Sequence, residues 1–374
     1  MRVDKSKWQK IFLGEVCNLY QPKTIATSCL DSNGKYLVYG ANGVIGKYNE
    51  YNHKFPEVLI TCRGATCGTI NISKPFSWIN GNAMVVHPKE ENLLDFAFLG
   101  KAVSAIDYSK VITGAAQPQI TRANLQKVQI VIPTLVEQQT IASELDAVQE
   151  MIDGYKTQIT DLDALAQSIF LDMFGDVAIN DKHWDITPME QLGEFKNGLN
   201  YNKGKKGRTL KIIGVGDFQN IKSLTSFDDI SSIETENLPQ EYLLHNEDIV
   251  FVRSNGNKNL VGRCLEVYPN DVEITFSGFC IRFRKTVEII NKYLIALLTD
   301  MGFKKTHILK SNGIGIQNIN QKLLGNLPIP VPPIEMQQQF ANRLEAIEKQ
   351  KELIKSQLAD AETLMAERMQ YYFS

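Results

Sequence analysis

The chain has 374 residues, of which 43% are hydrophobic and 22% charged, and its formal net charge is −2. This length allows two or more domain cores, and the composition is typical of a globular protein. No run of about eighteen apolar residues and no apolar stretch near the N-terminus is present, which excludes a transmembrane helix and a secretory signal. The six cysteines form no CxxC pair, so we expect reduced thiols in a cytoplasmic protein.

The first segment, residues 1–132, is basic and rich in short β-type runs. It carries 15 Lys and Arg against 9 Asp and Glu. Apolar stretches at 35–48, 57–72 and 83–88 are punctuated by Gly and Asn, which predicts strands joined by tight turns. A helical stretch is expected at 92–105.

The second segment, residues 133–178, predicts one long helix with a coiled-coil seam. A proline opens it, which forces a helix start. Apolar residues then recur at alternating spacings of four and three, as in a coiled coil. The seam residues are Ile141, Leu145, Val148, Ile152, Tyr155, Ile159 and Leu162. Residues 133–179 hold one basic and nine acidic side chains, so this helix is strongly acidic.

Residues 179–331 repeat the character of the first segment, and residues 332–374 repeat the character of the helix. Strands are expected within 210–218, 248–268 and 274–284, and a helical stretch at 291–309, so each globular segment is α+β with an antiparallel or mixed sheet. The second seam comprises Phe340, Leu344, Ile347, Ile354 and Leu358, with basic Lys351 and Arg368 at two further seam positions.

The charges favour pairing of the two helices with each other. We expect the pair to be an antiparallel coiled coil with a pseudo-twofold repeat. The alternative is that each helix only caps its own domain. A helix of about 36 residues is about 54 Å long, or roughly sixteen base pairs of B-DNA. Such a pair would hold two domains at a fixed separation.

The two helical segments are copies in one register. Adding 199 to the numbers from 133 to 174 aligns them without a gap. Matching pairs are Pro133 and Pro332, Gln138 and Gln337, Ala142 and Ala341, Leu145 and Leu344, and Phe174 and Phe373. A duplicated unit indicates one physical task performed twice.

The motif PTLVEQQTIASEL from Pro133, with its second copy PPIEMQQQFANRL from Pro332, resembles the helix start of the specificity subunits of type I restriction-modification systems (the HsdS family). Thr134 stands where that family often has a second proline, and Met336 where a glutamate is usual. The resemblance covers nearly the whole chain.

The resemblance implies a non-catalytic DNA-binding subunit of a type I methyltransferase and restriction endonuclease. Residues 1–132 and 179–331 would be target recognition domains, each reading one half of a two-part sequence in double-stranded DNA. The helices at 133–178 and 332–374 would set the spacer and bind two methyltransferase subunits, which restriction (motor) subunits join. S-adenosylmethionine, ATP and magnesium are expected on those partners and not on this chain, and no membrane is involved.

Polar and cationic residues in predicted loops are the candidate DNA contacts, because base edges need paired donors and acceptors and phosphates need cations. The candidates of the first domain are Asn42, Arg63, Thr66, Asn80, Asn82, Gln117 and Gln119. Those of the second are Lys203, Lys205, Lys206, Arg208, Arg253, Asn255, Asn257, Lys258, Ser311 and Asn312. The run 203–208 predicts a basic loop. Each Asn or Gln has an alternative role as a turn-former, and the basic run could be a solvated turn.

Enzymatic signals are weak. The run 40–47 misses the phosphate-loop spacing by one residue, and 213–218 has only a GxG. No N/D-P-P-Y/F methyltransferase motif is present, and the five histidines are scattered. Two alternatives remain beside the specificity subunit: a DNA reader that serves another defence or regulatory complex, and a coiled-coil adaptor without a DNA role.

Overall fold

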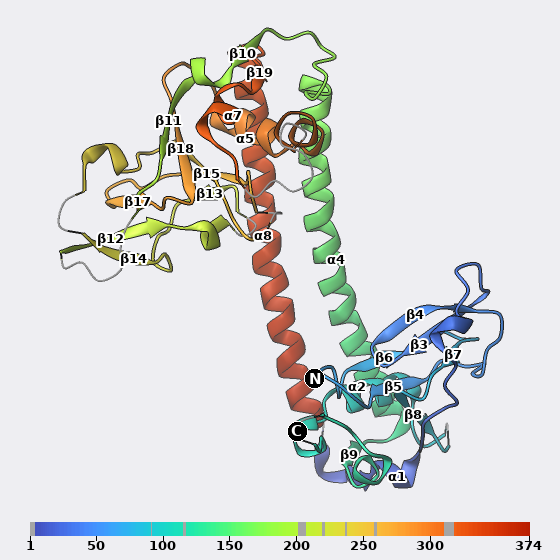
Figure 1. The fold of residues 1–374 in the computed structure, drawn as a ribbon. Helices are drawn as coiled ribbons and strands as arrows, with labels where there is room; N and C mark the ends of the chain where they lie inside the picture. The colour runs from blue at the N-terminus through green and yellow to red at the C-terminus, as the bar shows by residue number, and fades with distance from the viewer. Residues whose placement is uncertain are drawn as a thin grey trace. The chain divides into compact units, whose positions relative to one another are not determined.

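The computed structural model describes residues 4–90, 92–114, 117–200, 207–218, 221–235, 238–257, 260–309 and 318–374. The chain forms two compact units, the first of residues 1–157 with 355–374 and the second of residues 158–354. In each unit, the sheets and short helices lie beside that unit's sections of the two long helices (Figure 1). Each unit combines one globular domain with the start of one long helix and the end of the other.

The first unit contains a four-stranded antiparallel sheet and a three-stranded mixed sheet. The order of the first sheet is β2-β8-β5-β6, and that of the second is β4-β3-β7, with β3 and β7 parallel. The strands are β2 (Cys17–Tyr20), β3 (Tyr36–Gly40), β4 (Gly43–Tyr48), β5 (Val58–Thr61), β6 (Ile70–Ile72), β7 (Trp78–Ile79) and β8 (Ala83–Pro88). All four residues of β5 are buried, which explains its unbroken apolar run.

A separate two-stranded ribbon, β1 (Gln9–Phe12) with β9 (Gln129–Ile132), joins the two ends of this domain. The helices of the domain are α1 (Leu13–Val16), α2 (Phe96–Ser104) and α3 (Arg122–Leu125). Short 3₁₀ turns lie at η1 (Lys5–Lys7), η2 (Thr27–Cys29) and η3 (Tyr108–Lys110). Asp95 caps α2 by accepting a hydrogen bond from the Phe98 amide, as an Asp before a helix commonly does.

The second unit repeats this strand order and adds one further strand, β13, parallel to β16 at the edge of its main sheet. Its main sheet runs β11-β18-β15-β16-β13, and its smaller sheet runs β14-β12-β17, with β12 and β17 parallel. The main-sheet strands are β11 (Gly193–Asn197), β13 (Ser223–Leu224), β15 (Asp248–Val252), β16 (Cys264–Val267) and β18 (Cys280–Lys285). The smaller sheet has β12 (Arg208–Ile213), β14 (Ser232–Thr235) and β17 (Ile274–Phe276). The duplication inferred from the helices therefore extends to both sheets.

The ribbon of the first unit also has a counterpart, formed by β10 (Ile186–Pro188) and β19 (Pro328–Pro330). The helices here are α5 (Asn291–Thr299), α6 (Met301–Phe303), the π-helical η7 (Lys304–Leu309) and α7 (Gln321–Gly325). Short 3₁₀ turns are η4 (Met189–Gln191), η5 (Val215–Phe218) and η6 (Gln240–Tyr242). The α+β class predicted from the sequence is confirmed.

The long helices are α4 (Leu135–Phe174) and α8 (Ile334–Phe373), each of 40 residues and so about 60 Å long. Thr134 and Glu137 form a capping box at the start of α4. The Glu137 carboxylate accepts hydrogen bonds from the Thr134 amide (2.9 Å) and hydroxyl (2.7 Å). Threonine at this position therefore keeps the helix start that proline supplies in the second copy.

The two helices pair in antiparallel fashion inside each unit. In the first unit, the Tyr372 hydroxyl near the end of α8 donates to Glu144 near the start of α4 (2.6 Å), and Arg368 pairs with the same carboxylate (3.1 Å). In the second unit, Lys351 of α8 pairs with Asp163 of α4 (2.5 Å). Basic seam residues of α8 thus meet acidic residues of α4, as the charges predicted.

Apolar seam residues lie in the helix interface. Those that are buried are Ile141, Leu145, Val148, Ile152, Leu162, Phe340, Leu344, Ile347 and Ile354, whereas Tyr155, Ile159 and Leu358 are half-buried. Within the first unit, Val148 and Ile152 pack against Ala361. In each unit, the described seam residues of both helices are therefore buried or half-buried.

A buried glutamine fastens the start of each helix to its own domain. Gln138 accepts from the Asp95 amide (2.8 Å) and donates to the carbonyls of Leu93 and Pro133 (both 3.0 Å). Gln337, its repeat counterpart, accepts from the Ile290 amide (3.0 Å) and donates to the Pro332 carbonyl (2.8 Å). The repeated glutamine therefore has one structural task in both copies.

The cysteine thiols are all free. Burial raises the pKa of Cys62 to about 11 and the pKa of Cys17, Cys264 and Cys280 to about 12. Burial also raises the pKa of the half-buried Cys67, whereas Cys29 is exposed. No helix among the residues described is long and apolar enough to cross a membrane.

We expect a small aromatic disulfide reagent to modify Cys29 first in the native chain, because thiolates at accessible positions react fastest. The half-buried Cys67 should react next, and the four buried thiols should react only as the chain opens. Peptide mass spectrometry over a time course would check this order. Early modification of Cys264 would contradict the burial described here.

Candidate nucleic-acid interface

Four loops of the first unit meet beyond the end of β5. The Thr61 hydroxyl donates to the carbonyl of Ala41, in the turn between β3 and β4. The Cys62 amide donates to the Asn82 carbonyl (3.2 Å), and the Cys62 carbonyl accepts from the Ile120 amide (2.9 Å). Backbone bonds therefore fix the β3–β4 turn, the β5–β6 loop, the β7–β8 turn and the segment before α3 as one edge.

All the candidate residues of the first domain in the predicted set except Asn80 lie exposed on this edge. They are Asn42, Arg63, Thr66, Asn82, Gln117 and Gln119. Arg63 and Gln119 form an antiparallel bridge, and the Gly64 amide donates to the Pro118 carbonyl (3.1 Å). Side chains far apart in the sequence are thereby collected on one surface, where their polar groups face solvent.

Asn80 was predicted as a possible reader, but it is a structural residue. Its side chain is buried, and its Oδ1 accepts hydrogen bonds from the Ile25 amide (3.0 Å) and from Trp78 Nε1 (3.1 Å). An amide engaged in this way cannot contact a base edge. For this residue the turn-forming alternative holds.

The second unit builds an equivalent edge beyond β15. The Arg253 amide donates to the Phe279 carbonyl (2.8 Å), and the Arg253 carbonyl accepts from the Ile319 amide (2.8 Å). Ile319 is the repeat counterpart of Ile120, which makes the matching bond in the first unit. Ser254 bridges Asn318, as Arg63 bridges Gln119.

Two of the candidate side chains on this second edge already make local hydrogen bonds within the protein. Arg253 is half-buried, and its Nη1 donates to the Gly278 carbonyl (3.5 Å). Asn255 is half-buried, and its Oδ1 accepts from the Asn257 amide (2.7 Å), which is a turn-forming bond. Asn257 is exposed. Among the described residues, this edge therefore presents fewer exposed amide side chains than the first.

Six candidates of the second domain, Lys203, Lys205, Lys206, Lys258, Ser311 and Asn312, lie outside the described residues. Arg208 was predicted at the end of a basic loop, but it is the first residue of β12 and pairs with Glu273 (2.8 Å). Its charge is already matched by that carboxylate. Arg208 is therefore a strand residue and not a loop cation.

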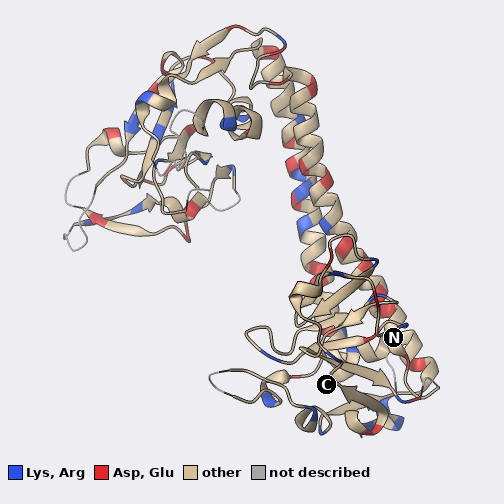
Figure 2. Cartoon of the chain, turned by 45° about the vertical axis from the view of Figure 1, so that its right-hand side comes forward, with Lys and Arg blue, Asp and Glu red and all other residues tan. Residues whose placement is uncertain are grey.

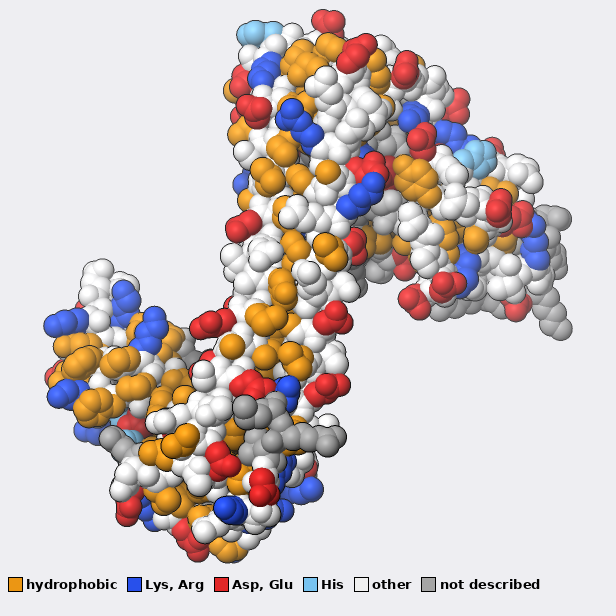
Figure 3. Space-filling view, turned by 180° about the vertical axis from the view of Figure 1, so that it is seen from behind, with side chains coloured by type: hydrophobic (Ala, Val, Ile, Leu, Met, Phe, Trp, Pro, Cys, Tyr) orange, Lys and Arg blue, Asp and Glu red, His pale blue; other side chains and the backbone are white. Residues whose placement is uncertain are grey.

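Other surfaces differ in character from these edges. Figure 2 shows cations and carboxylates mixed along the long helices. Figure 3 shows hydrophobic side chains, with lysines around them, on the lobe that contains β3, β4 and β7. Large hydrophobic side chains that are exposed in this part of the chain include Phe55 (63% exposed), Val44 and Tyr51. Tyr51 contacts Tyr36 at the end of the β3–β4 hairpin remote from Asn42, whereas Val44 lies two residues from Asn42, next to the loop edge.

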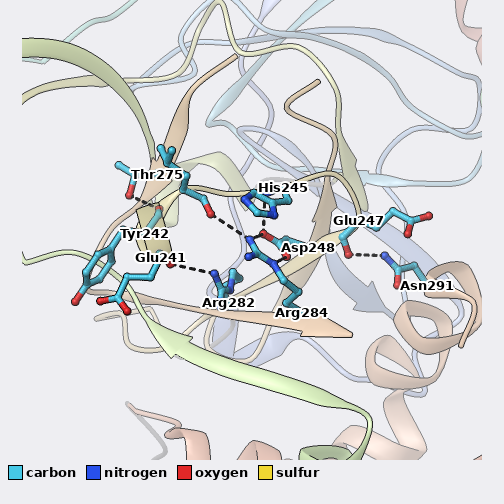
Figure 4. A network of polar contacts seen from close by, with 10 residues as sticks. Glu241, Tyr242, His245, Glu247, Asp248, Thr275, Arg282, Arg284 and Asn291 are labelled. Carbon is cyan, nitrogen blue, oxygen red and sulfur yellow. Dashed lines mark hydrogen bonds and ion pairs between the residues drawn. The ribbon is translucent and has the colours of Figure 1, made fainter. Parts of the chain in front are cut away.

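The second unit also contains a buried polar network at the start of β15 (Figure 4). Arg284 donates from Nε and Nη2 to the buried Asp248 carboxylate (both 2.7 Å). Arg282 donates to the Glu241 carbonyl (3.0 Å), and burial, with the charge of Arg284, lowers the pKa of Arg282. The network fixes the segment before β15 against β18, at the end of the strand opposite the loop edge. Its role is structural.

The weak enzymatic signals do not form catalytic sites among the residues described. The run 40–47 is a β-hairpin and not a strand–loop–helix, and Gly43 takes the left-handed φ of 92° required in its tight turn. Gly214 opens the 3₁₀ turn η5, with its amide bound to Asp217 (2.7 Å). In the described part of the chain, no three His, Cys, Asp or Glu residues gather as metal ligands.

Comparisons with known proteins agree with this arrangement. The sequence model of the type I restriction modification DNA specificity domain matches twice, over residues 5–163 and 181–363. The specificity subunit of the StySPI type I restriction enzyme of Salmonella potsdam is 24% identical over 342 residues, which cover 87% of this chain and 69% of that one. The MjaVIII specificity subunit of Methanocaldococcus jannaschii is 21% identical over 379 residues, covering 91% and 86%.

Solved structures show the same fold. The crystal structure of the type I restriction-modification S subunit from M. genitalium aligns with a TM-score of 0.63 at 14% identity, covering 100% of this chain and 98% of that one. A chain from a structural study of complex assembly and conformational transition in a type I restriction-modification system aligns with a TM-score of 0.60 at 15% identity, with the same coverage.

Proposed function

The chain belongs to the family of type I restriction-modification specificity subunits, and from this membership we propose how its parts divide the work of reading DNA. Each globular domain reads one half of a two-part sequence. The observation that carries the proposal is the duplicated loop edge, which follows β5 in the first unit and β15 in the second.

The exposed side chains of the first edge would contact the DNA bases directly. Arginine suits the O6 and N7 acceptors of guanine, and glutamine or asparagine suits the N6 and N7 groups of adenine. Arg63, Gln119 and Asn82 offer these groups from three loops that are held together by backbone hydrogen bonds. Fixed loops support specificity because less side-chain and backbone freedom is lost on binding.

The paired helices would set the spacer and bind methyltransferase subunits. Both helices keep exposed apolar side chains outside their seam, including Met151, Leu165, Leu171, Leu353 and Leu364. Leu165 and Leu364 are repeat counterparts and both are exposed, so the two helices offer related apolar surface. Two similar surfaces on one chain suit two copies of one partner.

The chain itself would be non-catalytic. S-adenosylmethionine would bind to the methyltransferase subunits, and ATP with magnesium would bind to the restriction subunits. These subunits would complete the complex in the cytoplasm. The support is the character of the loop edges, which offer hydrogen-bonding and cationic groups but no described pairing of a nucleophile with a base.

The direct test is to map modified bases in the native host's DNA with and without this gene. We expect a two-part methylated motif with an unspecified spacer, which disappears when the gene is deleted. Methylation that is identical in the two strains, in cells that express the partner subunits, would reject the proposal.

A helix deletion tests the spacer role. Removing residues 149–155 from α4 alone should prevent assembly or change the spacer, because that heptad faces the part of α8 around Ala361. Removing the facing residues 358–364 as well should restore pairing and shorten each helix by about 10 Å, or about three base pairs. Mapping of the methylated motif measures the spacer. Intact assembly with an unchanged spacer would show that the helices do not set the spacer length.

A further inference from the structure

A half-buried lysine lies at the base of the β15–β16 loop in the second unit. Lys304 is the first residue of η7, and its side chain packs on Gly262, next to the start of β16. A methyl group built on Gly262 would lie 3.6 Å from Lys304 Cε and 4.0 Å from its Nζ. The lysine therefore supports the same loop whose other part carries Arg253, Asn255 and Asn257.

The charges around Lys304 are positive. Burial lowers the pKa of Lys304, and the neighbouring Arg263 charge lowers it further against an opposing effect of Cys264. Cys264 has a pKa of about 12, raised by burial, so it is a neutral thiol at neutral pH and supplies no counter-charge. Lys222 is also close enough to act on Cys264. Lys222 lies beside β16, because its carbonyl accepts from the Glu266 amide (3.0 Å). Arg263 directly follows Gly262, on which Lys304 packs, and its Nη1 donates to the Phe218 carbonyl (3.3 Å). Lys222, Arg263 and Lys304 form what we call the β16 cation cluster.

No described carboxylate neutralises Lys304. Its ammonium makes no ion pair or hydrogen bond with any residue in the described ranges. Glu266, on the same strand as Cys264, instead accepts from the Tyr268 hydroxyl (3.2 Å), and Asp300 caps α6 through the Phe303 amide (2.8 Å). Residues 310–317, which follow η7, contain no Asp or Glu.

A partly buried cation without a nearby opposite charge is energetically unfavourable. An anion that binds beside it supplies the missing opposite charge, which favours binding. We propose that the β16 cation cluster binds a backbone phosphate of DNA beside the second half-site, with Lys304 as its central residue. This inference rests on the proposed function. The phosphate contact would position the β15–β16 loop, because phosphate contacts fix register while base contacts specify sequence.

The test uses the complex of the full chain with its methyltransferase subunits. Binding of the cognate duplex and of an unrelated duplex is measured over a series of salt concentrations, for wild type and for Lys304→Gln. We expect the slope of log K against log salt to become shallower by about 0.9, which is about fivefold weaker binding at 0.15 M salt. The loss should be equal for both duplexes, because a phosphate contact carries no sequence information.

Lys305→Gln is the matched control, since it removes the same charge from the next, exposed residue. Its salt slope should equal that of wild type. Without DNA, Lys304→Gln should melt at the wild-type temperature or higher, because it removes an uncompensated cation, whereas a purely structural lysine would lower that temperature. Lys304→Arg should restore most of the binding.

A salt slope for Lys304→Gln equal to that of Lys305→Gln would overturn the phosphate site while leaving the specificity function intact. A wild-type complex that binds both duplexes equally would instead reject the proposed function itself. The two failures are therefore distinguishable in one data set.

Discussion

Replacing Phe174 with alanine is expected to destabilise the second unit by about 3–5 kcal/mol, which is the range for removing a fully buried phenylalanine. Phe174 lies at the end of α4 and is 0% exposed. Its ring centroid is 4.7 Å from that of Tyr293, 5.2 Å from Phe170 and 5.5 Å from Phe340. The substitution would leave a cavity in this aromatic cluster, which joins α4, α5 and α8 within the unit.

Unfolding in urea, monitored by the proteolysis of the second unit, would measure the loss of stability. Leu171→Ala is the matched control on the same helical turn, because Leu171 is 58% exposed and should change stability by less than about 0.5 kcal/mol. Phe373, the repeat counterpart of Phe174, is only half-buried against Phe98, so Phe373→Ala should cost less than Phe174→Ala. Equal effects for Phe174 and Leu171 would contradict the packing.

The second large effect is expected for Gln138→Ala, which should lower the free energy of unfolding of the first unit by about 3 kcal/mol or more. The substitution leaves the Asp95 amide and the Leu93 and Pro133 carbonyls without their partner. An unsatisfied buried polar group costs about 1–3 kcal/mol. The bond to the Pro133 carbonyl is buried and should carry that full cost, whereas the bonds to Asp95 and Leu93 are partly buried and should add less. The start of α4 should therefore be held less tightly to the segment around residues 93–95 of the first domain.

Gln139→Ala provides the control, because the adjacent glutamine is exposed. The second copy offers the same comparison, between the buried Gln337 and the exposed Gln338. Hydrogen exchange of the helix starts would locate the loss, with faster exchange near residue 95 for Gln138→Ala and near residue 290 for Gln337→Ala. Equal stability of Gln138→Ala and Gln139→Ala would show that these hydrogen bonds contribute little.

The long helices could be predicted from the sequence because their physical signals are local. A proline marks each start, and the seam repeats at spacings of four and three. Pairing of the two helices with each other also followed from composition, since basic Lys351 and Arg368 needed acidic partners and found Asp163 and Glu144. The exact role of the repeated glutamine could not be predicted, because its partners lie at residues 93–95 and 290, far away in the sequence.

Individual contact residues were harder to predict for the same reason. Asn80 and Asn82 share one turn and one chemistry, yet Asn80 is buried by bonds to Ile25 and Trp78 while Asn82 is exposed. Arg208 looked like a loop cation because nothing near it in sequence reveals Glu273, its partner across the fold. Lys304 was not selected at all, since only the packing on Gly262 distinguishes it from Lys305.

The central claim is that each domain reads its own half-site, and an exchange of one domain tests it most directly. Residues 1–132 are replaced by the equivalent domain of a relative with a known, different motif, and methylated bases are mapped in cells that carry the partner subunits. We expect one half of the motif to change to that of the relative, while the other half and the spacer stay the same. A change in both halves, or in neither, would contradict the division of the reading between the two domains.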